Sequence, residues 1–315
     1  MSRKQGRILV IRGGAIGDFI LTLPALAALR QQFPQAHLEV LGYPHIAQLA
    51  LAGAVVDAVR PIEAPALAGF FARHGTLADS LRDYFSDFDI IVSYLFDPDL
   101  IFQENVALCS TAQFIVGPHR ARDGDQIHAA KVYLRPLERL AIFEADEVPR
   151  LKVVPGPRQH VLPPAAVTES SAPVAFHPGS GSERKNWPET KWRELVARFV
   201  DQTSLHLLLV GGEAEGERLQ RLARVLPKNR FTLARSLPLA ELAGLLPHCR
   251  AFVGHDSGIT HLAAALGLPC VVLWGETVEA VWRPRGKRLT VVREATGLPG
   301  ISTERVWTEL RSLIA

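Results

Sequence analysis

The sequence predicts an α/β protein of two domains, each a doubly wound parallel sheet covered by helices. Short β-branched runs alternate with longer amphipathic stretches, which is the rhythm of β-α-β units. The alternation stops between residues 155 and 173, where Pro, Ser and Ala predominate, and then restarts. The 315 residues are enough for two domains that each bury a core. We place the domains at residues 1–160 and 173–315, with a linker at 161–172.

In the first domain, the apolar run at residues 8–12 predicts a strand that leads into a helix. Three later runs have the same character and extend this sheet, at residues 37–43, 89–95 and 113–117. Ligands of such a sheet bind beyond the carboxyl ends of its strands.

The second domain repeats the pattern, so the chain contains two Rossmann-like units, and we expect them to face each other across a cleft. The last helix, at roughly residues 303–314, is a candidate to pack back on the first domain. We expect strands at 174–179, 205–212, 251–255 and 270–275, and helices at 191–202, 217–226 and 239–249, with another that ends at Gly267.

Composition narrows the class of protein. The 48% hydrophobic and 21% charged residues are typical of a folded chain, and the net charge of +3 without a long basic run gives nucleic-acid binding little support. The cysteines at 109, 249 and 270 show neither a CxxC pair nor disulfide-framework spacing, which suits a reducing cytoplasm. No secretory leader is expected, and no apolar stretch approaches the roughly 20 residues of a spanning helix.

A glycine-containing turn at residues 12–18 joins the first strand to its helix. Glycines there allow a ligand close to the backbone, and a helix N-terminus favours negative charge. A dinucleotide site is the rival interpretation. However, its GxGxxG fingerprint would place a glycine where Arg12 stands, and the run 37–43 ends without an acid to hold a ribose.

Asp18, at the start of this helix, allows two interpretations. Local preferences favour a cap or first-turn carboxylate. A sugar transfer by direct displacement instead needs a carboxylate that takes the proton of the acceptor hydroxyl. The two roles are compatible.

The second domain has two turns that suit a diphosphate. Residues 177–188 place small residues and then Lys185 after a strand, so that N–H groups, hydroxyls and a cation can surround phosphate oxygens. Residues 255–261 follow another strand and open a helix, where His261 shares a face with Ser257 and Gly258. A solvated loop, a plain N-cap at Asp256 or Ser257, and a structural histidine are the simpler alternatives.

Four segments together resemble glycosyltransferase family 9, the ADP-heptose:lipopolysaccharide heptosyltransferase family. They follow the order of that family along nearly the whole chain. They are RGGAIGDFILTLPALAALR, HPGSGSERKNWPETKWREL, VGGEAE and FVGHDSGITHLAAALGLPCVVLWG.

The resemblance implies a GT-B fold and an inverting transfer without metal from a nucleotide diphosphate heptose, typically ADP-heptose, bound mainly by the second domain. Asp18 matches the proposed catalytic base, and Glu213 matches an acid near the nucleoside. The donor residues implied on the diphosphate and sugar side are Ser180, Gly181, Lys185, Asp256, Ser257, Gly258 and His261.

Two departures from the family loosen the assignment of donor and acceptor. The first turn has Gly13 to Ile16 where many members carry hydroxyl or Met residues, and Ser180-Gly181 replaces a common Thr pair. Glu276 also replaces a proline in the region 274–277, which affects the purine pocket.

A metal-dependent transferase would instead use a DxD pair to hold a divalent ion on the diphosphate. Such pairs occur at residues 87–89, 97–99 and 123–125, but all three read as turn residues. We therefore expect no metal or other cofactor. The alternatives to a transferase are a nucleotide-sugar-binding protein without transferase activity and, more distantly, an NAD-dependent dehydrogenase.

The acceptor side is predicted from the loop 117–122 and the first turn. Positive side chains of this loop can hold the carboxylates or phosphates of an acidic glycolipid, and a solvated basic loop is the alternative. Phe70 and Phe71, with Arg73, are candidates for peripheral contact with the inner membrane, and a core edge is the alternative. The acceptor residues predicted are Gly14, Gly17, His119, Arg120 and Arg122.

Overall fold

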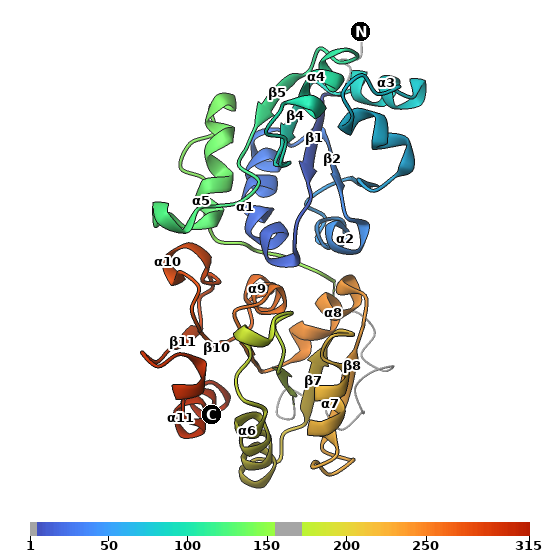
Figure 1. Cartoon of the computed structure of the whole chain (residues 1–315). Coiled ribbons are helices and arrows are strands. Elements are labelled where there is room, and N and C mark those ends of the chain that lie inside the picture. Colours follow the sequence, from blue (N-terminus) through green and yellow to red (C-terminus); the bar gives the residue numbers. More distant parts are fainter. Residues whose placement is uncertain (1–4, 155–171) are drawn as a thin grey trace. The chain divides into compact units, whose positions relative to one another are not determined.

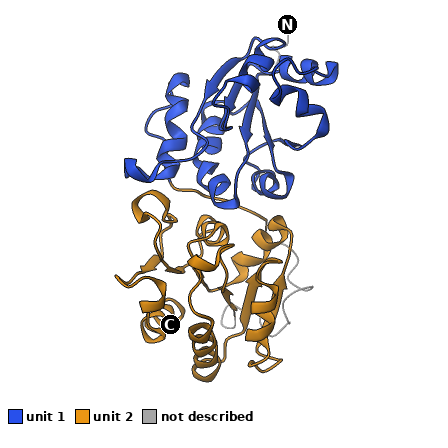
Figure 2. Ribbon diagram, viewed as in Figure 1, with its two compact units in different colours: residues 1–147 blue, residues 148–315 orange. Residues whose placement is uncertain are grey.

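The computed structural model describes residues 5–154 and 172–315 (Figure 1). The chain divides into two compact units, residues 1–147 and 148–315 (Figure 2). The expected end of the first domain at residue 160, and the predicted linker 161–172 apart from Ala172, lie outside the described residues.

The first unit is a five-stranded sheet in the order β3-β2-β1-β4-β5, and every pair of neighbours is parallel. The strand order reverses between β1 and β4, so the carboxyl end of β1 lies at a topological switch point. The strands are β1 (Arg7–Arg12), β2 (His37–Gly42), β3 (Ala58–Pro61), β4 (Ile90–Ser93) and β5 (Gln113–Val116). The helices are α1 (Ile16–Gln32), α2 (Pro44–Ala52), η1 (Pro65–Phe71), α3 (Asp79–Ser86), α4 (Ile101–Ala107), η2 (Asp123–Asp125), α5 (Ala129–Leu134) and η3 (Arg135–Leu140).

The second unit is a six-stranded parallel sheet in the order β11-β10-β9-β6-β7-β8. Its order reverses between β6 and β9, which are the two strands that precede the predicted diphosphate turns. The strands are β6 (Val174–His177), β7 (Leu207–Gly211), β8 (Phe231–Arg235), β9 (Ala251–His255), β10 (Cys270–Leu273) and β11 (Leu289–Val292). The helices are η7 (Glu183–Lys185), α6 (Glu189–Gln202), α7 (Gly216–Ala223), α8 (Leu239–Leu245), η8 (Leu246–His248), α9 (Gly258–Ala265), α10 (Glu279–Trp282), η9 (Leu298–Gly300) and α11 (Thr303–Ile314).

Burial explains which strands the sequence predicted. Central strands such as β7 and β9 are buried along their whole length and therefore read as continuous apolar runs. The sequence analysis missed β3, β8 and β11, which lie at the edges of the sheets and are only partly buried. An edge strand needs fewer apolar side chains, so its pattern is weaker.

Phe70 takes the core position that was the alternative prediction, and the last helix packs within its own unit. Phe70 belongs to the core of the first unit, beside Phe85 and Phe102, and only its neighbour Phe71 is partly exposed, at 45%. The last helix, α11, packs on α6 and on strands β9, β10 and β11 of its own unit. Its buried face is a stripe at helical spacing that joins the core of the second unit, and consists of Val306, Trp307, Leu310 and Ile314.

Candidate active site

The turn after β1 brings Asp18 to the switch point of the first sheet. Gly14 has a φ of +96°, which favours glycine, and α1 begins two residues later at Ile16. The N-cap position belongs to Ala15, whose side chain makes no capping bond, so Asp18 is a first-turn residue and not the cap. Its side chain is 25% exposed.

Two side chains hold the Asp18 carboxylate. The Tyr133 hydroxyl of α5 donates to Oδ1 over 3.2 Å, and Nη2 of Arg12 lies 3.8 Å from the same oxygen. Arg12 is only 2% exposed and also donates from Nη2 to the Asp18 carbonyl over 3.2 Å. Neither residue was singled out from the sequence, because a strand-end arginine and a helical tyrosine carry no motif.

The basic loop 117–122 is tied to this turn through its backbone. Nη1 of Arg12 donates to the carbonyl of His119 over 2.7 Å. The side chains of His119, Arg120 and Arg122 are exposed, and the His119 ring lies edge-on to Phe96. The structure thus brings the predicted acceptor loop beside Asp18, together with Gly14 and the half-buried Gly17, and their roles in acceptor binding stay predictions.

The turn after β6 is a glycine-containing loop whose backbone is bound by the carboxylate of Glu215. Glu215 accepts hydrogen bonds from the N–H of Gly181, over 3.4 Å, and of Gly212, over 2.9 Å. Its side chain fills the space where a Cβ on Gly179 would stand, so that position requires glycine. Ser180 donates internally to the Asn186 side chain over 2.8 Å, which closes the loop on itself.

An ion pair joins the turn after β9 to the turn after β6. Nζ of Lys185 lies 2.8 Å from Oδ2 of Asp256, and the Thr277 hydroxyl donates to the same oxygen over 2.7 Å. Ser257 is the N-cap of α9, since its hydroxyl accepts from the N–H of Thr260 over 3.3 Å, and Gly258 is the first helical residue. The plain-cap interpretation is therefore correct for Ser257 and not for Asp256.

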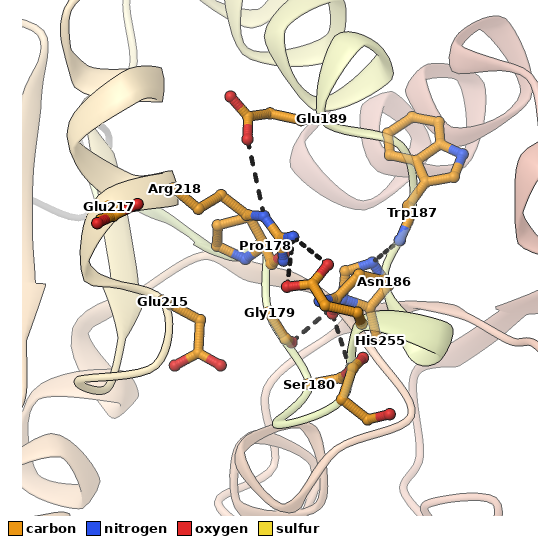
Figure 3. Close-up of polar contacts among 12 residues, drawn as sticks. Pro178, Gly179, Ser180, Asn186, Trp187, Glu189, Glu215, Glu217, Arg218 and His255 are labelled. Atoms are coloured by element: carbon orange, nitrogen blue, oxygen red, sulfur yellow. Dashed lines mark hydrogen bonds and ion pairs between the residues drawn. The ribbon is translucent and has the colours of Figure 1, made fainter.

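His255, the last residue of β9, connects backbone groups of the loop after β6 (Figure 3). Its Nε2 accepts from the N–H of Trp187 over 2.8 Å, and its Nδ1–H donates to the carbonyl of Gly179 over 3.1 Å. This pattern requires a neutral ring, and burial lowers the pKa of His255 to about 3.

Two further side chains complete the framework of the second unit. Burial lowers the pKa of His177, the last residue of β6, to about 4, although the charge of Glu215 opposes the shift. Arg218 of α7 donates to the Pro178 carbonyl over 3.2 Å and pairs with Glu183. The sequence analysis missed both, because their signal was only that of a strand end and a helix surface.

The two remaining predicted donor residues differ in burial. His261 is 5% exposed and lies in the first turn of α9. Glu213 has an exposed side chain, whereas Glu215, two residues later, is the buried carboxylate that reaches both glycine loops. A contact of Glu213 with a nucleoside stays a prediction.

Carboxylates of two of the DxD pairs accept hydrogen bonds from backbone N–H groups. Asp89 accepts from the N–H of Arg7 over 2.8 Å, and Asp97 accepts from two N–H groups at the start of α4. Asp123 and Asp125 lie in the short turn η2. In the described part of the chain, no three His, Cys, Asp or Glu side chains gather in a way that could hold a metal ion.

Comparison with known proteins identifies the family to which this chain belongs. Residues 143–306 match the model of glycosyltransferase family 9 (heptosyltransferase). The chain is 42% identical over 104 residues to lipopolysaccharide heptosyltransferase 1 of Pseudomonas aeruginosa, which covers 33% of this chain and 29% of that protein. It is 25% identical over 311 residues to lipooligosaccharide heptosyltransferase 2 of Haemophilus influenzae, covering 92% and 89% of the two chains.

A solved structure has the same fold. The ADP-heptose LPS heptosyltransferase II of E. coli superposes with a TM-score of 0.77 at 21% identity, over 98% of both chains. Two parallel α/β units of this kind make up the GT-B fold. The family match covers just over half of the chain, and the protein belongs to glycosyltransferase family 9.

No helix within residues 5–154 and 172–315 is both long and apolar enough to cross a membrane.

Proposed function

We propose that this enzyme transfers a heptose, with inversion, from ADP-heptose to a lipopolysaccharide-core or related acidic glycan acceptor. One observation carries the donor side: the Lys185–Asp256 ion pair of 2.8 Å joins the turns after β6 and β9, at the switch point of the second sheet. Ligands of open α/β sheets bind at such a point. The relatives named above, which are heptosyltransferases, support the sugar.

The second unit binds the diphosphate of the donor. The glycine-containing loop offers backbone N–H groups, the N-terminus of α9 favours negative charge, and Lys185 supplies a cation. Glu215 and His255 hold the loop from behind, so that its N–H groups are oriented before a ligand arrives. Together these groups can neutralise a leaving diphosphate, and the proposed reaction needs no metal or other cofactor.

The first unit supplies the base. Asp18 takes the proton of an acceptor hydroxyl while that oxygen attacks the anomeric carbon. The bond to the nucleotide diphosphate breaks on the opposite face, which inverts the configuration. Arg120 and Arg122 bind phosphates or carboxylates of the acceptor, and the lipid part of such an acceptor would bring the enzyme to the surface of the inner membrane.

Nucleotide protection tests the donor site. Thermal unfolding is measured with ADP, ADP-heptose and NADH, each in the presence of EDTA. ADP and ADP-heptose should raise Tm by mass action, and NADH should not. Protection by NADH, or an absolute need for a divalent ion, would contradict the proposal.

Product mass tests the acceptor. ADP-heptose and a heptose-free core oligosaccharide linked to lipid A should give a product heavier by one heptose residue. A panel of other nucleotide sugars serves as the control, and transfer from another donor alone would replace the proposed sugar.

A further inference from the structure

Tyr133 presents a buried hydroxyl to the proposed base. It lies in α5, which packs on α1, and its ring is 0% exposed. Burial raises the pKa of the Tyr133 hydroxyl above its ordinary value, although Arg12 opposes the shift. The hydroxyl therefore keeps its proton at neutral pH and donates it to Oδ1 of Asp18 over 3.2 Å.

Arg12 contacts both Tyr133 and Asp18. Its guanidinium is stacked over the Tyr133 ring, 4.5 Å from the ring centre, and lies 3.8 Å from Oδ1 of Asp18. A buried guanidinium is costly unless charge and hydrogen bonds compensate it. The Asp18 carboxylate supplies that charge, so its position is coupled to the packing of Arg12.

The two oxygens of the Asp18 carboxylate have different surroundings. Tyr133 donates a hydrogen bond to Oδ1, and the guanidinium of Arg12 lies 3.8 Å from the same oxygen. Oδ2 lies beside the turn, where a Cβ built on Gly14 would be 3.4 Å away. Gly14 has no side chain that would cover Oδ2, and 25% of the surface of the Asp18 side chain is exposed.

We infer that Tyr133 and Arg12 are positioning residues that hold Oδ1 and thereby present Oδ2 of Asp18 to the acceptor hydroxyl. This inference rests on the proposed role of Asp18 as the base. In the transfer step, Oδ2 receives the proton as the acceptor oxygen forms its bond to the sugar, and Tyr133 keeps its own proton throughout.

The same pair links the base to the predicted acceptor loop. Arg12 donates to the carbonyl of His119 over 2.7 Å, and Tyr133 lies under the same guanidinium. Arg120 and Arg122 lie on this short segment. The pair therefore connects the segment that carries the predicted acceptor residues to the carboxylate that takes the proton.

Tyr133→Phe tests the inference. The variant keeps the ring under Arg12 and removes only the hydroxyl. We expect kcat for transfer to fall about tenfold or more, because small errors in the position of a catalytic group are costly. The KM for the donor and the Tm increase with ADP should stay unchanged, since the donor groups lie in the second unit.

Tyr84→Phe is a matched control. Tyr84 is also buried in the first unit and donates its hydroxyl to a carboxylate, Oε1 of Glu39, over 2.7 Å, but Glu39 has no proposed role in transfer. Both variants should lower Tm, and only Tyr133→Phe should lower kcat. Equal loss of kcat in the two variants would reduce Tyr133 to a structural residue.

Asp18→Asn separates this inference from the proposed function. If Asp18→Asn is inactive and Tyr133→Phe keeps full kcat, the positioning role is wrong and the base stands. If Asp18→Asn keeps full kcat, the base itself is wrong. In the Asp18→Asn background, Tyr133→Phe should cause no further loss, whereas an additional tenfold loss would overturn the coupling.

Arg12→Lys provides a second variant for the same role. Lysine keeps the charge but cannot reach His119 and Asp18 with two parallel N–H groups. We expect kcat to fall while the KM for the donor stays unchanged. A folded Arg12→Lys protein with normal kcat would contradict the role of Arg12.

Discussion

The turn after β1 and the turns after β6 and β9 have the same location in their sheets but different chemistry. Each follows a strand at a switch point and leads toward a helix. In the first unit, a buried cation and a tyrosine support one partly exposed carboxylate. In the second, backbone N–H groups and Lys185 are supported by carboxylates and neutral histidines. The difference between the turns lies in the side chains behind them, which hold a carboxylate in the first unit and orient backbone N–H groups in the second.

The side chains that support the turns differ in charge between the two units. The positive charge of Arg12 lies behind the carboxylate of Asp18, the proposed base. In the second unit the backbone N–H groups are oriented both by the Glu215 carboxylate and by a neutral histidine. The neutral ring of His255 bonds to two backbone groups and adds no charge.

The largest effect should come from the first unit. Asp18→Asn removes the proton acceptor but keeps the size of the side chain. We expect kcat to fall about 10²- to 10⁴-fold, which is the usual contribution of general base catalysis. Single-turnover transfer and ADP binding are measured together. A loss of ADP binding as large as the loss of kcat would mean that the two turns are not separate in function.

The next effect concerns the cation of the second unit. Lys185→Ala should weaken ADP binding about tenfold to a hundredfold, because a hydrogen bond to a charged group contributes about 1.5–3 kcal/mol. Arg184→Ala is the matched control, since Arg184 is adjacent in η7 and exposed. Calorimetric Kd values of the two variants are compared. Similar values for both would show that general positive charge, and not the Asp256-paired lysine, attracts the diphosphate.

A smaller effect should distinguish two neighbouring acids. Glu215→Ala leaves the N–H groups of Gly181 and Gly212 without their carboxylate, and we expect a loss of about 1–3 kcal/mol in the free energy of unfolding. Glu213→Ala changes an exposed side chain and should stay within about 0.5 kcal/mol of the wild type. Urea unfolding measures both. A Glu213 variant that is stable but binds ADP poorly would confirm the nucleoside contact predicted from the sequence.

The smallest effect concerns the neutral histidines. The folded pKa values of His177 and His255, about 4 and 3, lie below the ordinary 6.5, so the unfolded chain takes up protons that the folded chain does not. Their contribution is complete above pH 6.5 and is lost as pH falls toward 4. Between pH 7 and pH 6 each should cost about 0.7 kcal/mol of the free energy of unfolding.

His255→Gln provides the check on this pH dependence. Glutamine does not titrate in this range. Between pH 7 and pH 6 the free energy of unfolding should therefore fall by about 0.7 kcal/mol less in the variant than in the wild type. Urea unfolding at the two pH values measures this difference. An identical pH dependence in both proteins would mean that His255 does not stay neutral in the folded state.

The sequence predicted the central strands, the two-domain organisation and the positions of the site turns, because these depend on local features. Buried parallel strands are continuous apolar runs, and glycine turns at their ends are visible in the sequence. The helix at 303–314 was predicted with its observed bounds. Its partner was not, because an amphipathic helix specifies the face that it buries and not the surface that covers it.

In the candidate site, too, some residues could be predicted from the sequence and others could not. Asp18, Lys185 and Asp256 were singled out from the sequence because each lies close to the junction between a predicted strand and the helix that follows. Their partners Tyr133 and Thr277 are 115 and 21 residues away from the side chains they contact, and no local pattern connects them. Tertiary packing alone decided that Tyr133 bonds to Asp18, and that Glu215 holds the glycine loop. Hydrogen bonds between distant segments depend on where the sheet brings them, and that is a property of the folded chain.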